Sequence, residues 1–381
     1  MVAPESPAYP LLFIADGDPL DTSTNSGVPK HLIDSLRLRI GTPMFFHNGH
    51  LSGLHYRMLS ILSMRFTKVA RFQARNFGRM SMFYRFIILY AKVLLLKLRY
   101  KGVNLLQVRG LHLHIIKRNV RLFLYLDTSV VLTEREWPKW STKGKLLEFR
   151  KRIEKANILN ASRIFVVSEY LKSFICDYYD LNESKVVVVG NGISEIWLDE
   201  LDERKTSNNT ETDNTFNIFF VGRERERKGL DILEEACEIA RTKVNHPVIL
   251  HVIGIDQESS NSVRYYGRLS SVHTRIRLQE GDVFCLPSRH EPFGIALIEA
   301  MSLGLPCIAT NINAFPEILG CGRYGQIVES GSADALASAL IWTSRNYSEA
   351  LDIALKGRSH VRRNFTWNMV ASRMLPYLIH E

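Results

Sequence analysis

The stretch that most constrains the fold lies between residues 284 and 306, where an apolar run, a polar turn and a helix-like repeat follow one another. The apolar run predicts a buried strand, and the residues from Ile295 onwards keep a helical period until Gly304 and Pro306. A strand that leads through a turn into a helix directs free backbone N–H groups and a positive dipole end at one point. The stretch therefore predicts an anion-binding site.

Two carboxylates flank this predicted site. Glu291 lies in the turn, and Glu299 lies about one turn into the expected helix. Because carboxylates repel phosphate, we expect them to accept hydrogen bonds from hydroxyl groups of the same ligand. A molecule that carries phosphate between two hydroxylated rings meets both demands, and a nucleotide-sugar is such a molecule.

The spacing of these carboxylates also carries a resemblance. The motif Glu291-x7-Glu299 within EPFGIALIEAMSLGLP resembles the signature of the retaining family-4 glycosyltransferases. The resemblance implies an α/β protein with the GT-B fold, in which two Rossmann-like doubly wound domains face a central cleft. It implies that Glu291 is catalytic and holds the sugar hydroxyls, and that Glu299 holds the ribose hydroxyls. It also implies that Phe293, Gly294 and Ile295 line the donor site.

A second match to the family follows the strand expected at 217–221. The segments VGR and KGLDIL resemble its diphosphate-binding loop, which implies that Arg223 and Lys228 hold the leaving pyrophosphate. A planar guanidinium and a mobile ammonium group both suit that ligand. The resemblance gives no role to Arg225 or Arg227, and the run RERERK in isolation would be interpreted as a solvated surface.

Three further candidates occupy turns that follow expected strands. Gly27 lies in a small turn before a helical run; the matching family loop lies against donor and acceptor, and a plain tight turn is the alternative. Asn191 belongs to an Asn-Gly turn that in the family leads into the interdomain cleft. Asp127 follows the strand 122–126 and is a candidate catalytic residue. Many family members have a His-Asp pair here, whereas this chain has Leu126 before the Asp, and a helix cap is the alternative.

Strands and helices alternate in both halves of the chain, as two Rossmann-like units require. We expect a basic, acceptor-binding domain at 1–198 that faces a membrane, and a domain at 216–362 that binds the nucleotide-sugar donor. A polar linker is expected at 199–215, and a terminal helix at 363–381 that crosses back to the first domain. The expected strands are residues 11–15, 105–108, 122–126, 163–167, 185–189, 217–221, 248–253, 263–267, 283–286 and 306–310.

Charge is unevenly distributed along the chain. Positions 35–126 contain 17 Lys and Arg and no Asp or Glu. This asymmetry predicts peripheral contact with an anionic membrane, which we favour over nucleic acid because no zinc-finger or RNP-like motif is present. Within it, 80–98 is nearly all apolar. We favour a core helix with snorkelling cations there, and an amphipathic helix in the lipid interface is the alternative.

Other kinds of site have little support in the sequence. The five cysteines are scattered without a C-x-x-C spacing, which indicates reduced thiols in a cytoplasmic protein. Asp16 and Asp18 form a D-x-D pattern in a loop, and His112 and His114 lack a third ligand, so we expect no metal and no cofactor. We also expect no signal peptide and no membrane-spanning helix.

The resemblance therefore implies a metal-independent, retaining hexosyltransferase that takes a UDP- or GDP-linked sugar as its donor. The acceptor is expected to be lipid-linked, or a polysaccharide or glycoconjugate, at the cytoplasmic face of a membrane. Two alternatives stay open. A GT-B sugar-nucleotide epimerase would need no acceptor, and a non-catalytic basic binding module would show no donor-dependent thermal shift.

Overall fold

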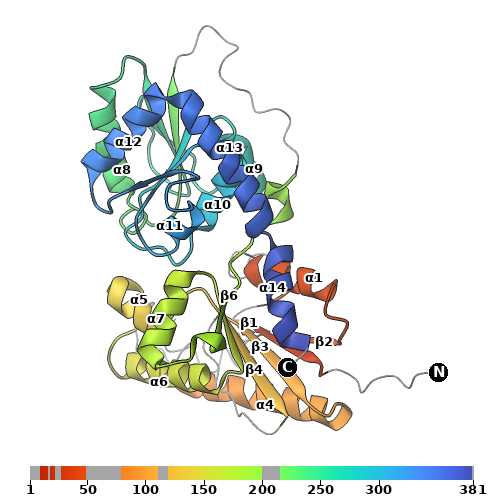
Figure 1. The fold of residues 1–381 in the computed structure, drawn as a ribbon. Helices are drawn as coiled ribbons and strands as arrows, with labels where there is room; N and C mark the ends of the chain where they lie inside the picture. The colour runs from red at the N-terminus through yellow and green to blue at the C-terminus, as the bar shows by residue number, and fades with distance from the viewer. Residues whose placement is uncertain are drawn as a thin grey trace, which may run out of the picture. The chain divides into compact units, whose positions relative to one another are not determined.

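The chain forms two compact units, each built on its own parallel sheet (Figure 1). The computed structural model describes residues 9–15, 18–21, 27–48, 79–109, 119–199 and 215–379. The first unit comprises residues 1–189 and 370–381, and the second comprises residues 190–369. The predicted α/β class with two Rossmann-like units is confirmed.

The first unit contains a six-stranded sheet with the order β2-β1-β3-β4-β5-β6. Its strands are β1 (Leu11–Ala15), β2 (Met44–Asn48), β3 (Val103–Val108), β4 (Val120–Leu126), β5 (Arg163–Val166) and β6 (Val186–Val188). Every residue of β1 and β3 is buried, which is typical of parallel strands that are covered on both faces. The buried Asn104 in β3 keeps its polar groups satisfied, because its Nδ2 donates to Leu378 O and its Oδ1 accepts from Arg121 Nε.

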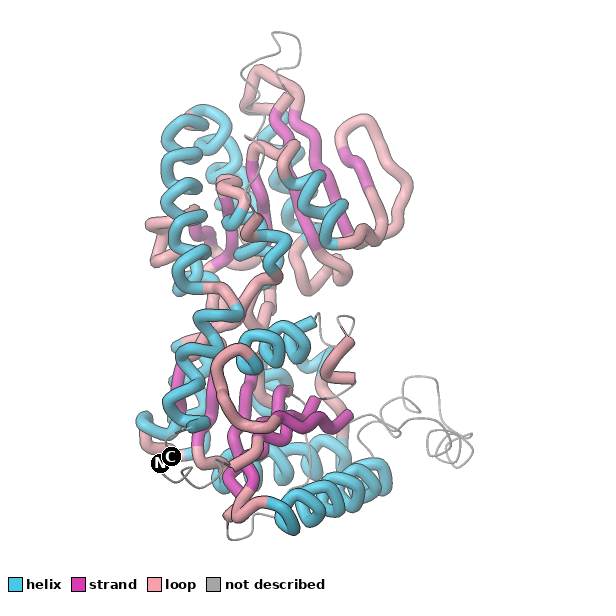
Figure 2. Tube along the Cα trace, turned by 90° about the vertical axis from the view of Figure 1, so that its right-hand side faces the viewer, coloured by secondary structure: helices cyan, strands magenta, loops and turns pink. Residues whose placement is uncertain are grey.

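Helices cover the first sheet (Figure 2). They are α1 (Val28–Arg37), α4 (Arg79–Arg99), α5 (Val130–Glu136), α6 (Gly144–Asn160), α7 (Glu169–Tyr179) and the greater part of α14 (Trp367–Ile379), with short 3₁₀ turns η2 (Pro138–Trp140) and η3 (Glu183–Lys185). The end of α14 packs against β5, where the Tyr377 ring lies 6.0 Å from that of Phe165. Arg373 of the same helix donates to Val189 O at 3.0 Å, so the C-terminal residues complete the first unit.

The second unit contains a six-stranded sheet with the order β12-β11-β10-β7-β8-β9. Its strands are β7 (Phe216–Val221), β8 (Val248–Ile253), β9 (Val263–Tyr265), β10 (Val283–Leu286), β11 (Cys307–Thr310) and β12 (Gln326–Val328). Its helices are η4 (Glu195–Trp197), α8 (Leu230–Arg241), α9 (Ser271–Leu278), α10 (Ile295–Ser302), α11 (Phe315–Ile318), α12 (Ala333–Arg345) and α13 (Tyr347–Asn364).

The direction of winding in the second sheet reverses between β7 and β10. The chain moves outward from β7 to β8 and β9, and then returns to place β10 on the other side of β7. Open parallel sheets bind ligands at the carboxyl ends of the strands where this reversal occurs. The loops that follow β7 and β10 are therefore the first place to search for a site.

Every strand expected from the sequence is present, whereas β2 and β12 were not predicted. Asp16, His112, His114 and residues 200–214 of the expected linker lie outside the described residues. In the parts of the chain that are described, no helix is long and apolar enough to cross a bilayer.

Candidate functional site

The loop between β7 and α8 coils into a single turn. Lys228 N donates to Glu224 O at 2.9 Å, and Leu230 N donates to Arg225 O at 3.0 Å. Residues three positions apart share a face in such a turn, and Arg227 forms an ion pair with Glu224 at 3.1 Å. The turn thus directs Arg227 inward, where its side chain is only 8% exposed.

Gly229 allows this loop to contact the loop that follows β10. Its φ is 72°, and a Cβ atom at this position would lie 1.9 Å from Pro287 O. Arg289 N donates to Arg227 O at 2.8 Å and joins the two backbones directly. Because a side chain fits neither the space nor the left-handed backbone, the close contact between the loops requires glycine.

Arg289 fixes the same pair of loops from the outside. Its guanidinium donates to Glu226 O at 2.6 Å and to both carboxylate oxygens of Asp231 at 2.8 and 2.6 Å. The bonds from Arg289 hold the pKa of Asp231 below its ordinary value. Two-point guanidinium contacts of this kind restrict geometry as well as adding energy, so the loops form a rigid frame.

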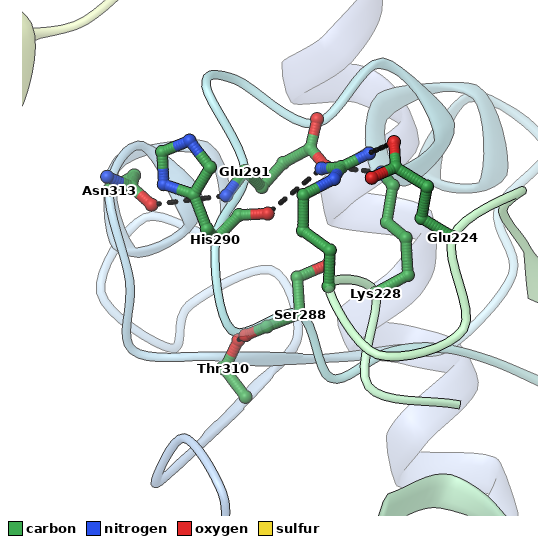
Figure 3. Close-up of polar contacts among 8 residues, drawn as sticks. Glu224, Lys228, Ser288, His290, Glu291, Thr310 and Asn313 are labelled. Carbon is green, nitrogen blue, oxygen red and sulfur yellow. Dashed lines mark hydrogen bonds and ion pairs between the residues drawn. The ribbon is translucent and has the colours of Figure 1, made fainter. Parts of the chain in front are cut away.

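Inside this frame a buried carboxylate contacts two buried cations (Figure 3). Glu291 Oε2 accepts a hydrogen bond from Lys228 Nζ and one from Arg227 Nη1, the latter at 3.1 Å. Arg227 also donates to His290 O at 3.0 Å. The side chains of Arg227, Lys228 and Glu291 are 8, 11 and 12% exposed, so these charges compensate one another away from solvent.

The pKa values of the two predicted carboxylates are shifted in opposite directions. Burial raises the pKa of Glu291, but the charges of Lys228 and Arg227 outweigh burial and hold this pKa below its ordinary value of 4.5. Burial also raises the pKa of Glu299, to about 8, and here only the charge of Lys228 opposes it. Near neutral pH, Glu291 is therefore ionised and Glu299 is mostly protonated.

The start of α10 borders this cluster. The helix begins after Gly294, whose φ is 114°, and has no side-chain N-cap. A Cβ at Gly294 would lie 2.4 Å from the Phe315 ring, so the turn needs glycine on both steric and backbone grounds. Ile295 is the first helical residue, and the buried Phe293 packs edge-on against Phe365 with ring centroids 5.9 Å apart. Uncapped helix amides beside two cations suit an anion.

Two further predicted donor residues, Arg223 and Asn191, also belong to the second unit. Arg223 is exposed and forms no ion pair with Glu291 or Glu299 within the described residues. Asn191 is fully buried and its Oδ1 accepts from Gly192 N at 2.9 Å. Its Nδ2 makes no hydrogen bond among the residues that the structure describes.

Gly27 and Asp127 belong to the first unit. Gly27 has a φ of 78° and precedes α1 as its N-cap residue. Asp127 follows β4, and its Oδ2 lies 3.0 Å from Arg109 Nη2. The neighbouring Ser129 caps α5 by accepting from Leu132 N, so the helix-cap alternative for Asp127 is wrong.

Two functional candidates were missed in the sequence. Arg227 was assigned no role, although it contacts Glu291 as directly as Lys228 does. Arg109 was not singled out, although it follows β3, which pairs in parallel with the strand that precedes Asp127. Each residue lies in the turn that follows a central strand, and this position is the feature from which a role could have been predicted.

Part of the chain resembles known proteins in sequence. Residues 199–360 match the profile of the family Glycosyl transferases group 1. The second unit thus contains the region that matches this family. The phosphatidyl-myo-inositol mannosyltransferase of Mycobacterium leprae is 32% identical over 168 residues, which cover 42% of this chain and 45% of that protein. The chain thus matches less than half the length of this relative.

Solved structures resemble a larger share of the chain. Sucrose-phosphate synthase from Thermosynechococcus elongatus has a TM-score of 0.69 at 17% identity, over 96% of this chain and 97% of that one. Anabaena HepE, solved with UDP and glucose, has a TM-score of 0.63 at 15% identity, over 97% and 98% of the two chains. These similarities confirm the predicted GT-B fold.

Proposed function

We propose that the chain is a retaining glycosyltransferase that moves a sugar from a nucleotide-sugar donor to an acceptor hydroxyl group. The observation that carries this proposal is the buried contact of Glu291 with Lys228 and Arg227 beside the uncapped start of α10. The Glycosyl transferases group 1 domain supports it, as do a mannosyltransferase relative and a fold neighbour that binds UDP and glucose.

In this proposal the donor replaces contacts that exist within the protein. Lys228 would leave Glu291 for the diphosphate, which the α10 amides and the exposed Arg223 would also contact. Glu291 would then accept hydrogen bonds from the sugar hydroxyls, and Glu299 would bind the ribose hydroxyls. No metal is assigned a role, because these cations and amides would stabilise the charge of the leaving group.

The chemical step follows from this arrangement. The acceptor oxygen would form a bond to the anomeric carbon on the face from which the diphosphate oxygen departs. The proton of the acceptor hydroxyl would pass to the departing phosphate oxygen, and the anomeric configuration would be retained. Exclusion of water from the site would limit hydrolysis of the donor.

A thermal-shift screen against UDP- and GDP-sugars tests the donor site. We expect at least one donor to raise the melting temperature of the wild type and to lose this effect in Lys228→Ala. Lys243→Ala, which removes an exposed lysine of the same unit, serves as the matched control. A wild type that responds to no donor would favour a binding module. Conversion of a donor to its epimer without an acceptor would favour an epimerase.

We further propose that transfer takes place at an anionic membrane surface, and helix α4 supports this. Its residues Leu89 and Val93 are buried. Apolar side chains on the opposite side are 38–82% exposed, namely those of Ile87, Ile88, Leu94, Leu95 and Leu98. Over residues 87–98, whose side chains the structure describes, the core-helix interpretation thus holds for one face only. The five exposed side chains follow a helical period, as in helices that lie in a lipid interface.

The sequence suggests that the cations of this region face anionic lipid, but one of them is bonded within the protein. Lys92 donates to Phe46 O at 3.1 Å and is thereby held against β2. Arg99 and Lys101, at the end of the helix, are exposed and available to anionic headgroups. The proposed location is the cytoplasmic face, with the acceptor carried by a lipid or a glycan.

Vesicle sedimentation tests the membrane contact. The wild type is expected to sediment with vesicles of phosphatidylcholine and phosphatidylglycerol, and less with phosphatidylcholine alone. The double variant Leu94→Ser/Leu98→Ser should bind several-fold less, because both side chains are exposed on the proposed lipid face. Leu355→Ser, at a leucine 46% exposed in the second unit, should bind normally. Equal sedimentation with both kinds of vesicle would refute the proposal.

A further inference from the structure

The loop that follows β11 contains a residue in the left-handed backbone conformation. Asn313 has a φ of 45°, a conformation that glycine adopts without steric cost and that residues with a Cβ atom adopt rarely. Asparagine tolerates it better than most side chains, but the backbone alone would favour glycine. Left-handed residues other than glycine concentrate at active sites and ligand-binding loops. We therefore expect the side chain of Asn313 to have a role that glycine could not fill.

That side chain reaches the neighbouring loop, which follows β10. Asn313 Oδ1 accepts a hydrogen bond from Glu291 N at 3.3 Å (Figure 3). The loop after β11 and the main-chain amide of Glu291 are thus joined by a contact that requires a side-chain acceptor. Glycine at position 313 would keep the conformation of the loop and lose this bond.

Glu291 is consequently held both at its carboxylate and at its amide. The carboxylate accepts hydrogen bonds from Lys228 and Arg227, and the amide donates to Asn313. In the proposed exchange Lys228 would leave the carboxylate for the diphosphate, whereas the bond to Asn313 occupies no carboxylate oxygen. Asn313 would therefore keep the direction of the Glu291 side chain defined after one of its cations has left. Hydrogen bonds behind a ligand-binding side chain commonly serve to orient it in this way.

Other contacts fix the two loops without the Asn313 side chain. The strands that precede them, β10 and β11, pair in parallel. The buried Thr310 hydroxyl at the end of β11 donates to Ser288 O at 2.7 Å, and Phe315, which begins α11, is fully buried. Removal of the Asn313 side chain should therefore leave the fold intact and release only the amide of Glu291. A positioning role can thus be measured separately from stability.

We propose that Asn313 is a positioning residue for the sugar of the donor, because its bond to Glu291 N directs the Glu291 carboxylate towards the sugar hydroxyls. This inference rests on the proposed glycosyltransferase function, in which Glu291 binds those hydroxyls. The diphosphate and the nucleoside would contact other residues. Asn313 accordingly contributes to the affinity for a nucleotide-sugar and not to the affinity for the nucleotide alone.

Isothermal titration calorimetry with UDP, GDP, UDP-glucose, UDP-N-acetylglucosamine and GDP-mannose tests this difference. Asn313→Gly should weaken the binding of the nucleotide-sugar about fivefold, as expected for one hydrogen bond, and that of the matching nucleotide less than about twofold. Asn313→Asp keeps an acceptor and should bind as the wild type does. Cys321→Gly is the matched control, because it places glycine at another left-handed residue of the second unit, with φ 54° and an exposed side chain. It should leave both affinities unchanged.

A double variant separates positioning from direct contact with the sugar. In Glu291→Ala the group that Asn313 orients is absent, so the addition of Asn313→Gly should cause no further loss of affinity. Additive losses would mean that Asn313 contacts the sugar itself, and would overturn the positioning role. The melting temperature of each variant without ligand verifies that it is folded.

The outcomes distinguish this inference from the proposed function. If the wild type binds neither nucleotides nor nucleotide-sugars, the donor site is refuted and the role of Asn313 with it. If the wild type binds a nucleotide-sugar, three results would refute the role of Asn313 alone. These are normal binding by Asn313→Gly, equal weakening of nucleotide and nucleotide-sugar, and failure of Asn313→Asp to restore the affinity.

Discussion

Replacing Glu299 with Gln should stabilise the second unit, and the gain should grow with pH. Burial raises the pKa of this carboxyl from its ordinary value of 4.5 to about 8. When the pKa of a group is higher in the folded state than in the unfolded state, the stability that the group contributes is complete below the unfolded-state pKa. This stability is lost as the pH rises through the folded-state pKa. The wild type therefore carries an increasing cost of ionisation between these two values, and glutamine of nearly the same shape carries none.

The size of the effect follows from the two pKa values. The free energy of unfolding of the wild type falls by at most about 1.4 kcal/mol per pH unit through this one group. Integrated from about pH 6 to about pH 8, with allowance for partial ionisation near pH 8, the loss is about 2 kcal/mol. For a unit of this size, about 2 kcal/mol corresponds to a difference of about 4–8 °C in melting temperature.

Differential scanning fluorimetry at several pH values measures this difference. The melting temperature of Glu299→Gln minus that of the wild type should rise steadily from about pH 6 to about pH 8. Glu291→Gln is the matched control, because the pKa of Glu291 is lowered by its cations. Its stability contribution is already complete above pH 4.5, so this variant should be less stable by a constant amount over the same range. A flat difference for Glu299→Gln would refute the reasoning.

Two further predictions concern the loop between β7 and α8. Arg227→Met should lower the free energy of unfolding by about 2 kcal/mol, because it removes buried hydrogen bonds to Glu291 and His290 O while Lys228 still compensates the carboxylate. Arg225→Met, in the same loop but 43% exposed, should cost less than about 1 kcal/mol in urea denaturation. Gly229→Ala should cost well over about 2 kcal/mol, because its Cβ would overlap Pro287 O as well as strain the backbone. Gly331→Ala, with φ 86° and open space around it, should cost about 1 kcal/mol, and equal melting temperatures for these two variants would contradict the account.

The fold could be predicted because its central strands can be recognised from their own residues. β1 and β10 are apolar throughout, since helices cover both faces of a parallel sheet. β12 was missed for the converse reason. It lies at an edge with one neighbouring strand, and its residues Gln326 and Ile327 are only partly buried. An edge strand needs few apolar residues, so its sequence gives a weak periodic signal.

The site was only partly predictable for a similar reason. Glu291 and Lys228 could be named because a long motif surrounds each of them, and the structure places their side chains in contact. Arg227 could not, because the charge run around it fits a solvated extended loop equally well. Its inward direction depends on the turn closed by the bond from Lys228 N to Glu224 O, and on the contact of Gly229 with Pro287. Neither feature follows from residue type or spacing.

Two cations contact the Glu291 carboxylate, which explains how this buried group could release one of them to a ligand. A buried carboxylate that loses its only counter-ion bears a desolvation cost of several kcal/mol. Arg227 is held by Glu224 and by His290 O as well as by Glu291, whereas Lys228 has a flexible chain. Lys228 could therefore move to an incoming diphosphate while Arg227 keeps Glu291 ionised for the sugar hydroxyls. Arg227, to which the family motif gives no role, is thus the residue that makes it energetically feasible for Lys228 to leave Glu291.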